Sequence, residues 1–277
     1  MLAACVTDTC GSTGALLFAN NPLSAICSIV CPHENNCYGS CVLGIKQKAV
    51  SFFEIEQYLS GKYLYSFDCS KPEKNGMRVA VVGAGPAGIT MSILLAQKGF
   101  RVTLMEEQNQ IGGVLRYGIP EFRLPRTRVD AYQDILRKLG VIIKPSCYIG
   151  SNLSIDDMFM DGYDAVFLAV GTAKPNRLGL LGETLGHVHF AIDFLKSPKV
   201  HDLGNHVVVI GAGNVAMDAA RTALRMGDDM KVTVINNRRE QDVTATREEF
   251  SMAVEEGVLF MHQLSVLRIT DDGVICA

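Results

Sequence analysis

One stretch, residues 79–88, constrains the fold of this chain more than any other. It reads Val-Ala-Val-Val-Gly-Ala-Gly-Pro-Ala-Gly, a short apolar strand that leads into the glycine pattern G-x-G-x-x-G. Gly83 permits a tight turn, Gly85 lets the backbone approach a pyrophosphate, and Gly88 lets the next helix pack on the strand. The pattern predicts a helix over Ile89–Lys98 whose N-terminal amides face phosphate groups. The residues assigned to this site are Gly83, Gly85, Pro86, Ala87 and Gly88.

A second strand and an acidic residue complete this pattern. Arg101–Met105 predicts a buried strand, and Glu106 follows it, eighteen residues after Gly88. A carboxylate at this place accepts a hydrogen bond from the ribose of a bound dinucleotide. The order of strand, glycine turn, helix, strand and acid therefore predicts a dinucleotide site. The alternative is a glycine turn in an α/β domain that binds no ligand.

A second glycine pattern follows further along the chain. Val207–Ile210 is an apolar strand, and residues 211–216 then read G-x-G-x-x-A at the start of an expected helix. The next strand, Lys231–Ile235, ends in Asn-Asn-Arg-Arg and not in an acid. Arginine offers paired donors to a phosphate, so this site favours NADP over NAD, with an exposed basic turn as the alternative. Its assigned residues are Gly211, Gly213, Asn214, Val215, Ala216, Arg238 and Arg239.

Two further segments are expected to lie near the first dinucleotide. Residues 111–125 hold three glycines and two prolines, which exclude regular structure through most of the segment. A loop rich in glycine, arginine and tyrosine here suits a flavin, with a purely structural connection as the alternative. Residues 163–172 predict a buried strand that ends in a glycine turn at the ligand edge of the sheet. The candidate contacts in these segments are Gly113, Arg116, Gly171 and Thr172.

Cysteines are crowded near the N-terminus. The chain has nine, which is many where no sequence signal indicates an oxidising compartment, and six of them fall in the first 41 residues. Cys27, Cys31, Cys37 and Cys41 are spaced C-x3-C-x5-C-x3-C, and Pro32 follows the second. Zinc sites usually show C-x2-C pairs, whereas iron–sulfur ligands often lie in short loops with a proline after a cysteine. The spacing favours an iron–sulfur cluster and leaves zinc or unligated thiols as alternatives.

Composition excludes several classes of partner. The chain is 48% hydrophobic and 20% charged with a net charge of −3, and no basic block stands out, so nucleic acid is not an expected partner. No apolar run reaches the ~18 residues that a membrane span needs. Residues 2–5 resemble a lipoprotein cleavage box but lack a preceding charged or apolar region. We therefore expect no membrane association and a cytoplasmic location.

The two glycine sites together predict a flavin enzyme. One has an acid suited to a ribose and the other has arginines suited to a phosphate, which places FAD in the first site and NADPH in the second. The flavin performs the difficult chemistry, so no acid, base or nucleophile is assigned to the protein. Disulfide reductases share this layout but use a C-x-x-C pair, which this sequence lacks. The electrons need another exit, and the N-terminal cysteines offer one.

From about residue 20 onward the chain resembles the flavoprotein family of the glutamate synthase small subunit, which also includes the N-terminal half of dihydropyrimidine dehydrogenase. Residues 112–125 are the most specific part of the match. It also rests on Asn21-Pro22, the cysteine run, Gly83–Gly88, Ala169–Thr172, Gly211–Arg221 and Arg238-Arg239. The resemblance implies electron flow from NAD(P)H through FAD to [4Fe–4S] clusters. It implies as partner the glutamate synthase large subunit or another redox subunit.

The same resemblance implies a set of cluster ligands. In the family the last three cysteines of the run are ligands shared between two clusters, which here are Cys31, Cys37 and Cys41. A carboxylate or amide on the following helix, expected over residues 50–59, can complete one cluster, and Glu56 best matches that position. Cys27 is a weaker candidate.

Three departures from the family bear on completeness. An earlier cysteine run is absent, and Cys5 and Cys10 do not reproduce its spacing. Thr244 stands where the family usually has proline, and the last FAD segment would lie beyond Ala277. We therefore expect an internal piece of a longer protein or a degenerate paralogue, and anticipate that this chain alone holds a cluster poorly.

The expected fold is α/β, with two Rossmann-like dinucleotide-binding domains preceded by a small helical, cysteine-rich iron–sulfur segment. Residues 1–70 are assigned to a partial iron–sulfur domain, 71–203 to an incomplete FAD-binding domain and 204–277 to an incomplete NAD(P)H-binding domain. The competing class is a non-catalytic nucleotide-binding or structural module of the same fold.

Overall fold

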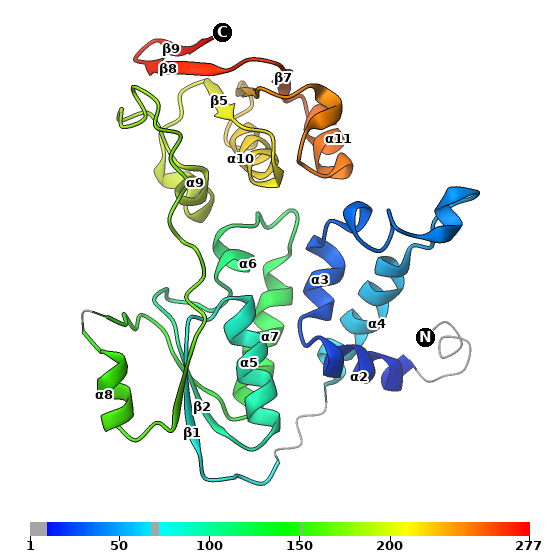
Figure 1. The fold of residues 1–277 in the computed structure, drawn as a ribbon, viewed down its shortest axis with the longest axis vertical. Coiled ribbons are helices and arrows are strands. Elements are labelled where there is room, and N and C mark those ends of the chain that lie inside the picture. The colour runs from blue at the N-terminus through cyan, green and yellow to red at the C-terminus, as the bar shows by residue number, and fades with distance from the viewer. Residues whose placement is uncertain (1–9, 68–71, 151) are drawn as a thin grey trace. The chain divides into compact units, whose positions relative to one another are not determined.

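The computed structural model describes residues 10–67, 72–150 and 152–277 (Figure 1). The chain divides into two compact units, one of Met1–Arg116 with Glu121–Thr172 and one of Tyr117–Pro120 with Ala173–Ala277. Residues 173–203, assigned from sequence to the first nucleotide domain, thus group with the second unit. The reason is packing: Phe194 and Leu195 of α9 (Ala191–Lys196) are buried in the core of that unit.

The first unit opens with a helical segment. In it α2 (Cys10–Asn20) and α3 (Ser24–Val30) both pack on α4 (Phe52–Ser66), and short turns η1 (His33–Asn35) and η2 (Val42–Ile45) lie between α3 and α4. The helix that the sequence predicts over residues 50–59 begins at Phe52 and extends beyond the predicted end. The helix continues to Ser66 because its face is buried through Leu64.

Among the described residues no single helix is long and apolar enough to cross a bilayer. The pair Gly11–Asn20 and Ser24–Val30 reaches that length and composition only when it is counted together across an 81° bend.

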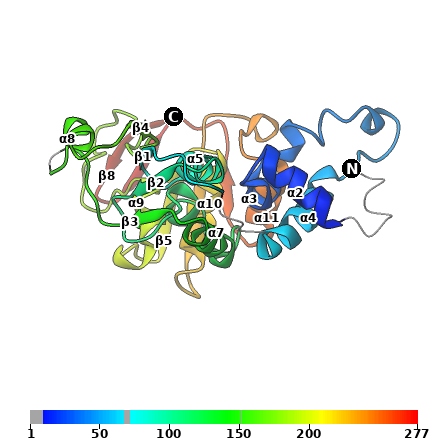
Figure 2. The same ribbon diagram turned by 90° about the horizontal axis from the view of Figure 1, so that it is seen from below.

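A four-stranded parallel sheet forms the rest of the first unit, in the order β3-β2-β1-β4. Helices α5 and α7 cover one face and α8 the other (Figures 1 and 2). Ala80 and Val82 of β1 pack with Met158 of α8, so the alternate residues of this strand serve the two faces. The elements are β1 (Arg78–Val82), α5 (Pro86–Gln97), β2 (Arg101–Met105), α6 (Val114–Tyr117), α7 (Arg126–Lys138), β3 (Ile142–Lys144), α8 (Ile155–Met160) and β4 (Ala165–Leu168).

Strand β4 is less buried than its apolar sequence predicts. It pairs with β1 on one side only, which makes it an edge strand of this sheet. Leu168 is accordingly 54% exposed, and no residue of β4 is fully buried. The prediction of a buried strand was therefore wrong, although a strand does end just before Gly171.

The second unit holds a three-stranded parallel sheet, in the order β5-β6-β7, and an antiparallel hairpin, β8-β9. Met217 and Ala220 of the helix after β5 pack against Val232 and Val234 of β6 to form its core. The remaining elements are η3 (Pro198–Val200), β5 (His206–Ile210), α10 (Asn214–Leu224), β6 (Lys231–Ile235), η4 (Glu240–Asp242), α11 (Arg247–Glu255), β7 (Leu259–Met261), β8 (Val266–Thr270) and β9 (Gly273–Cys276).

A cluster of ion pairs fastens α11 to α10. Arg221 is buried and bonds Glu249 through Nη1 (2.7 Å) and Glu256 through Nη2 (2.8 Å). Arg225 Nη1 lies 2.5 Å from the other oxygen of Glu256. Hydrogen bonds from Arg225 and Arg221 lower the pKa of Glu256 to about 2. Ion pairs with a buried partner interact more strongly than exposed ones. This cluster therefore fixes the position of α11, the helix that follows Arg238 and Arg239.

Candidate cofactor-binding sites

The first glycine turn has the geometry that its sequence predicts. Gly83 has a φ of +97°, and a Cβ there would lie 2.4 Å from the carbonyl oxygen of Ala169, so only glycine fits. A Cβ on Gly88 would lie 1.8 Å from the carbonyl oxygen of Gly83 and 3.5 Å from Val81. The helix therefore starts hard against the strand, as expected.

The loop after β2 closes on this turn from the other side. Gly112 donates its N–H to the carbonyl of Ala84 (2.8 Å). Gly113 has a φ of +51°, and a Cβ on it would lie 2.8 Å from the Cα of Gly85. The two backbones thus touch where a pyrophosphate would approach, while the first-turn amides of α5 have no helical acceptor and suit a phosphate. These residues fit the dinucleotide that the sequence predicts.

Glu106 is held rigidly at the end of β2. The side chain is buried, Oε2 accepts the N–H of Ala84 (2.7 Å), and Oε1 accepts the N–H of Gln108 (2.9 Å). Each carboxylate oxygen can accept a second hydrogen bond. The group is therefore orientated by backbone and keeps acceptor capacity for a ribose hydroxyl.

The side chain of Arg116 bonds to other groups of the protein. Its side chain is buried, Nε donates to the carbonyl of Ile111 (2.7 Å), and its guanidinium pairs with Asp130 of α7. These contacts fix the glycine-rich loop onto α7, and a direct bond from Arg116 to a cofactor stays a prediction. Gly171, with a φ of +68°, and Thr172 are exposed just after β4, at the carboxyl edge that also carries the turn.

Four of the predicted ligand residues lie near one another in the helical segment. Cys31 caps α3, and Asn36 Nδ2 lies 3.5 Å from its sulfur. Burial raises the pKa of the Cys31 thiol, and the charges of Cys27, Cys37 and Glu56 act in the same direction. The structure therefore brings Cys31, Cys37, Cys27 and Glu56 into one electrostatic neighbourhood.

Cys41 has a different environment. The backbone N–H groups of Val50, Leu43 and Gly44 are directed at its sulfur and lower the pKa of this thiol. Thiols with N–H donors fit an iron–sulfur cluster in their chemistry. Within the described ranges no three His, Cys, Asp or Glu side chains are arranged to hold a metal ion, so the ligand assignments stay predictions. Cys5 lies outside the described residues.

The second glycine turn joins β5 to α10. Gly211 has a φ of +115° and donates its N–H to the carbonyl of Ile235 (2.9 Å), and Gly213 is the N-cap of α10. Asn214 accepts the N–H of Thr246 through Oδ1 (2.9 Å), which ties the turn to the start of α11. Val215 is half-exposed and Ala216 is buried, so only the former is open to a ligand on its side-chain face.

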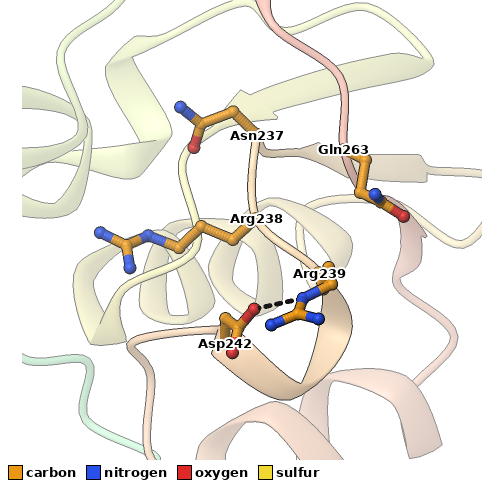
Figure 3. Close-up of a pocket in the computed structure, with 5 residues that line it drawn as sticks. All are labelled: Asn237, Arg238, Arg239, Asp242 and Gln263. Atoms are coloured by element: carbon orange, nitrogen blue, oxygen red, sulfur yellow. Dashed lines mark hydrogen bonds and ion pairs between the residues drawn. The ribbon is translucent and has the colours of Figure 1, made fainter.

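The turn after β6, residues 237–239, lines an open pocket of about 720 Å³, here called the arginine pocket (Figure 3). Arg239 Nε lies 2.7 Å from Asp242 Oδ2. Arg238 extends away from this pair, and its guanidinium has no bonding partner among the residues that the structure describes. The two arginines, treated as equivalent from the sequence, are therefore different. The lining residues are Asn237, Arg238, Arg239, Asp242 and Gln263.

Sequence reasoning missed Asp242 and Gln263. The Arg-x-x-Asp spacing of residues 239–242 is a detectable signal, since such a pair meets in a turn. Gln263 has a φ of +60° and donates its N–H to the carbonyl of Arg238 (3.1 Å). Its place depends on how β7 ends, for which the sequence offers no signal.

Fold and sites together define a class. Each of the two units contains a parallel sheet with a glycine turn after its first strand. The strand that comes after the first turn is followed by a buried acid, and the strand that comes after the second is followed by arginines. This is the layout of an oxidoreductase that binds two dinucleotides.

Comparison with known proteins identifies the family. Residues 77–275 match the pyridine nucleotide-disulphide oxidoreductase family, and residues 2–65 match dihydropyrimidine dehydrogenase domain II, 4Fe-4S cluster. The first match covers well over half of the chain. The chain belongs to the pyridine nucleotide-disulphide oxidoreductase family.

Relatives and solved structures agree. The chain is 34% identical over 270 residues to the glutamate synthase [NADPH] small chain of Escherichia coli, covering 91% of this chain and 57% of that protein. It is 33% identical over 263 residues to the NAD-dependent dihydropyrimidine dehydrogenase subunit PreT of Salmonella typhimurium, covering 92% and 62%. Mycobacterium tuberculosis FprA in complex with NADPH has the same fold, with a TM-score of 0.60, 16% identity, and 73% and 66% coverage. The chain thus spans about six-tenths of these two curated relatives.

Several predictions from sequence are thereby confirmed. They are the resemblance to the glutamate synthase small subunit family and the α/β fold with an N-terminal iron–sulfur segment. The two family matches also confirm the cofactor classes, a flavin with a pyridine nucleotide and a [4Fe–4S] cluster. The residues that hold each cofactor remain proposals.

Proposed function

We propose that the protein passes electrons from NADPH through FAD to [4Fe–4S] clusters, and from there to a partner subunit, as a glutamate synthase small subunit does. The observation that carries the proposal is the difference between the two glycine turns. One is followed by a carboxylate with free acceptor capacity, Glu106, and the other by Arg238, whose guanidinium has no partner among the described residues. A carboxylate suits a ribose hydroxyl and repels a phosphate, whereas a guanidinium attracts one.

Each proposed role follows from these contacts. The amides of the first turn of α5 bind the FAD pyrophosphate, with Gly85 and Gly113 leaving room for it, and Glu106 orientates the ribose. Arg238 and Arg239 bind the 2′-phosphate of NADPH. Bound FAD supplies the exchange between two-electron and one-electron chemistry.

The cysteines are proposed to serve two clusters. Cys31 and Cys37, completed by Glu56, belong to one cluster, and Cys41, with its separate set of N–H donors, belongs to the other. Support comes from the shared electrostatic neighbourhood of the first three and the different surroundings of Cys41. Cys27, beside Cys31, is the reserve ligand.

The test of the proposal is a coenzyme comparison in the anaerobically purified full-length protein. Wild-type protein should show a flavin spectrum that NADPH bleaches at lower concentration than NADH. Replacing Arg238 and Arg239 together with alanine should raise the Kd for NADPH by at least about tenfold, since charged hydrogen bonds contribute ~1.5–3 kcal/mol each, and leave NADH nearly unchanged. Lys231→Ala, at the other end of β6, is the matched control.

Two outcomes would contradict the proposal. Equal losses for NADPH and NADH would mean that the arginines are structural. A protein that binds neither flavin nor coenzyme would instead support the competing class, a non-catalytic module of the same fold.

A further inference from the structure

The arginine pocket contains a carboxylate, Asp242, whose negative charge repels the 2′-phosphate proposed to bind there. Asp242, at the end of η4, holds Arg239 Nε at 2.7 Å, and both side chains are exposed enough to meet solvent. This bond occupies one edge of the Arg239 guanidinium and leaves its two Nη groups to a ligand. Figure 3 shows the bonded pair on one side of the pocket and Arg238 on the other.

The charge of the lining is accordingly smaller than its arginines suggest. Two cations and one carboxylate line the pocket, and the other lining residues, Asn237 and Gln263, are neutral. A phosphate that enters meets the guanidinium of Arg238, which is unpaired within the described part of the chain, the already paired guanidinium of Arg239, and the like charge of Asp242. Opposite charges attract a phosphate and like charges repel it, so Asp242 reduces the attraction in two ways.

We propose that Asp242 is a specificity-determining residue that weakens binding of a 2′-phosphate, so that Arg238 carries most of the discrimination between NADPH and NADH. The inference rests on the proposed function, in which this pocket receives the 2′-phosphate. It adds that the ratio of NADPH affinity to NADH affinity is smaller than it would be if both arginines were unpaired.

The experiment measures ligand fragments directly in the full-length protein, so that neither flavin nor turnover enters the result. The probes are adenosine 2′,5′-bisphosphate, which carries the 2′-phosphate, and AMP, which lacks it. Asp242→Asn should tighten the bisphosphate Kd about threefold, as expected for an exposed charge pair, and leave the AMP Kd unchanged. Asp242→Glu keeps the charge and should stay within about twofold of wild type.

The arginine variants separate the two residues. Arg238→Ala should weaken the bisphosphate at least about tenfold and Arg239→Ala only about threefold, both relative to AMP. If Asp242→Asn weakens the bisphosphate or leaves it unchanged, Asp242 serves to position Arg239 and the inference is overturned. Equal losses in the two arginine variants would overturn it too.

Failure of the underlying function would look different. If neither Arg238→Ala nor Arg239→Ala changes the ratio of the bisphosphate Kd to the AMP Kd, the pocket does not receive a 2′-phosphate, and both statements fall. An unchanged AMP Kd in each variant shows that the unit is folded.

Discussion

Glu256 should contribute substantially to the free energy of unfolding of the second unit. Its two oxygens bond Arg221 and Arg225, and its pKa lies at about 2 where an ordinary glutamate has 4.5. That difference corresponds to ~3 kcal/mol of stability at pH 7. Glu256→Gln should lose somewhat less, ~2–3 kcal/mol, because Arg221 keeps its bond to Glu249 and is not left unpaired.

The loss should depend on pH with a defined sign. The pKa is lowered in the folded state, so the stabilisation is fully present above the unfolded value of 4.5 and is lost as the pH falls towards 2. The gap between wild type and Glu256→Gln should therefore be constant from pH 6 to 8. At pH 3 it should fall to less than half.

Urea unfolding followed by circular dichroism measures both quantities. Glu255→Gln is the control, since this neighbour is exposed and removes the same charge from the same helix end. A loss for Glu256→Gln within ~0.5 kcal/mol of the control, which is the usual scatter of surface substitutions, would refute the reasoning. So would a gap that does not narrow on acidification.

Three further predictions concern the cofactors. Gly113→Ala should lower the flavin content several-fold, because the new Cβ meets Gly85 at 2.8 Å; Gly76→Ala, also at positive φ but in open space, controls for backbone strain and should retain flavin. Glu106→Leu should weaken flavin binding by ~1–3 kcal/mol in a titration of apoprotein, while the exposed neighbour variant Glu107→Leu should bind like wild type. In the full-length protein Cys31→Ser and Cys41→Ser should each remove a different [4Fe–4S] signal in electron paramagnetic resonance and Cys147→Ser neither; loss of the same signal in both would contradict the two-cluster assignment.

Local patterns predicted the frame of the fold well. Strands β2 and β6 begin and end where the apolar runs predict, and β5 lies within one residue of the expected strand. In each case a run of apolar residues and a following glycine or polar turn decide the element. Such signals are carried within a few residues of chain.

What the sequence missed depends on distant neighbours. The last turns of α4 are helical because Leu64 is buried by segments remote in sequence, and β4 is exposed because it lies at the edge of the sheet formed by the described strands. At the sites, the glycine positions were predictable, but the engagement of Arg116 by Asp130 and the contact of Gly85 with Gly113 were not. Both join residues on separate elements, which pattern reading cannot pair.

The two backbone hydrogen bonds that hold the carboxylate of Glu106 affect the entropy of ligand binding. A side chain that is already fixed loses no rotamer freedom when a ligand arrives, whereas a free arginine gives up ~0.5–1.5 kcal/mol on being immobilised. With Ala84 and Gln108 holding both oxygens of Glu106, and Arg238 without a partner in the described chain, the first site is ordered before binding and the second must be ordered by it. Of the two nucleotides proposed, this difference favours retention of the flavin through every turnover and release of the coenzyme after each one.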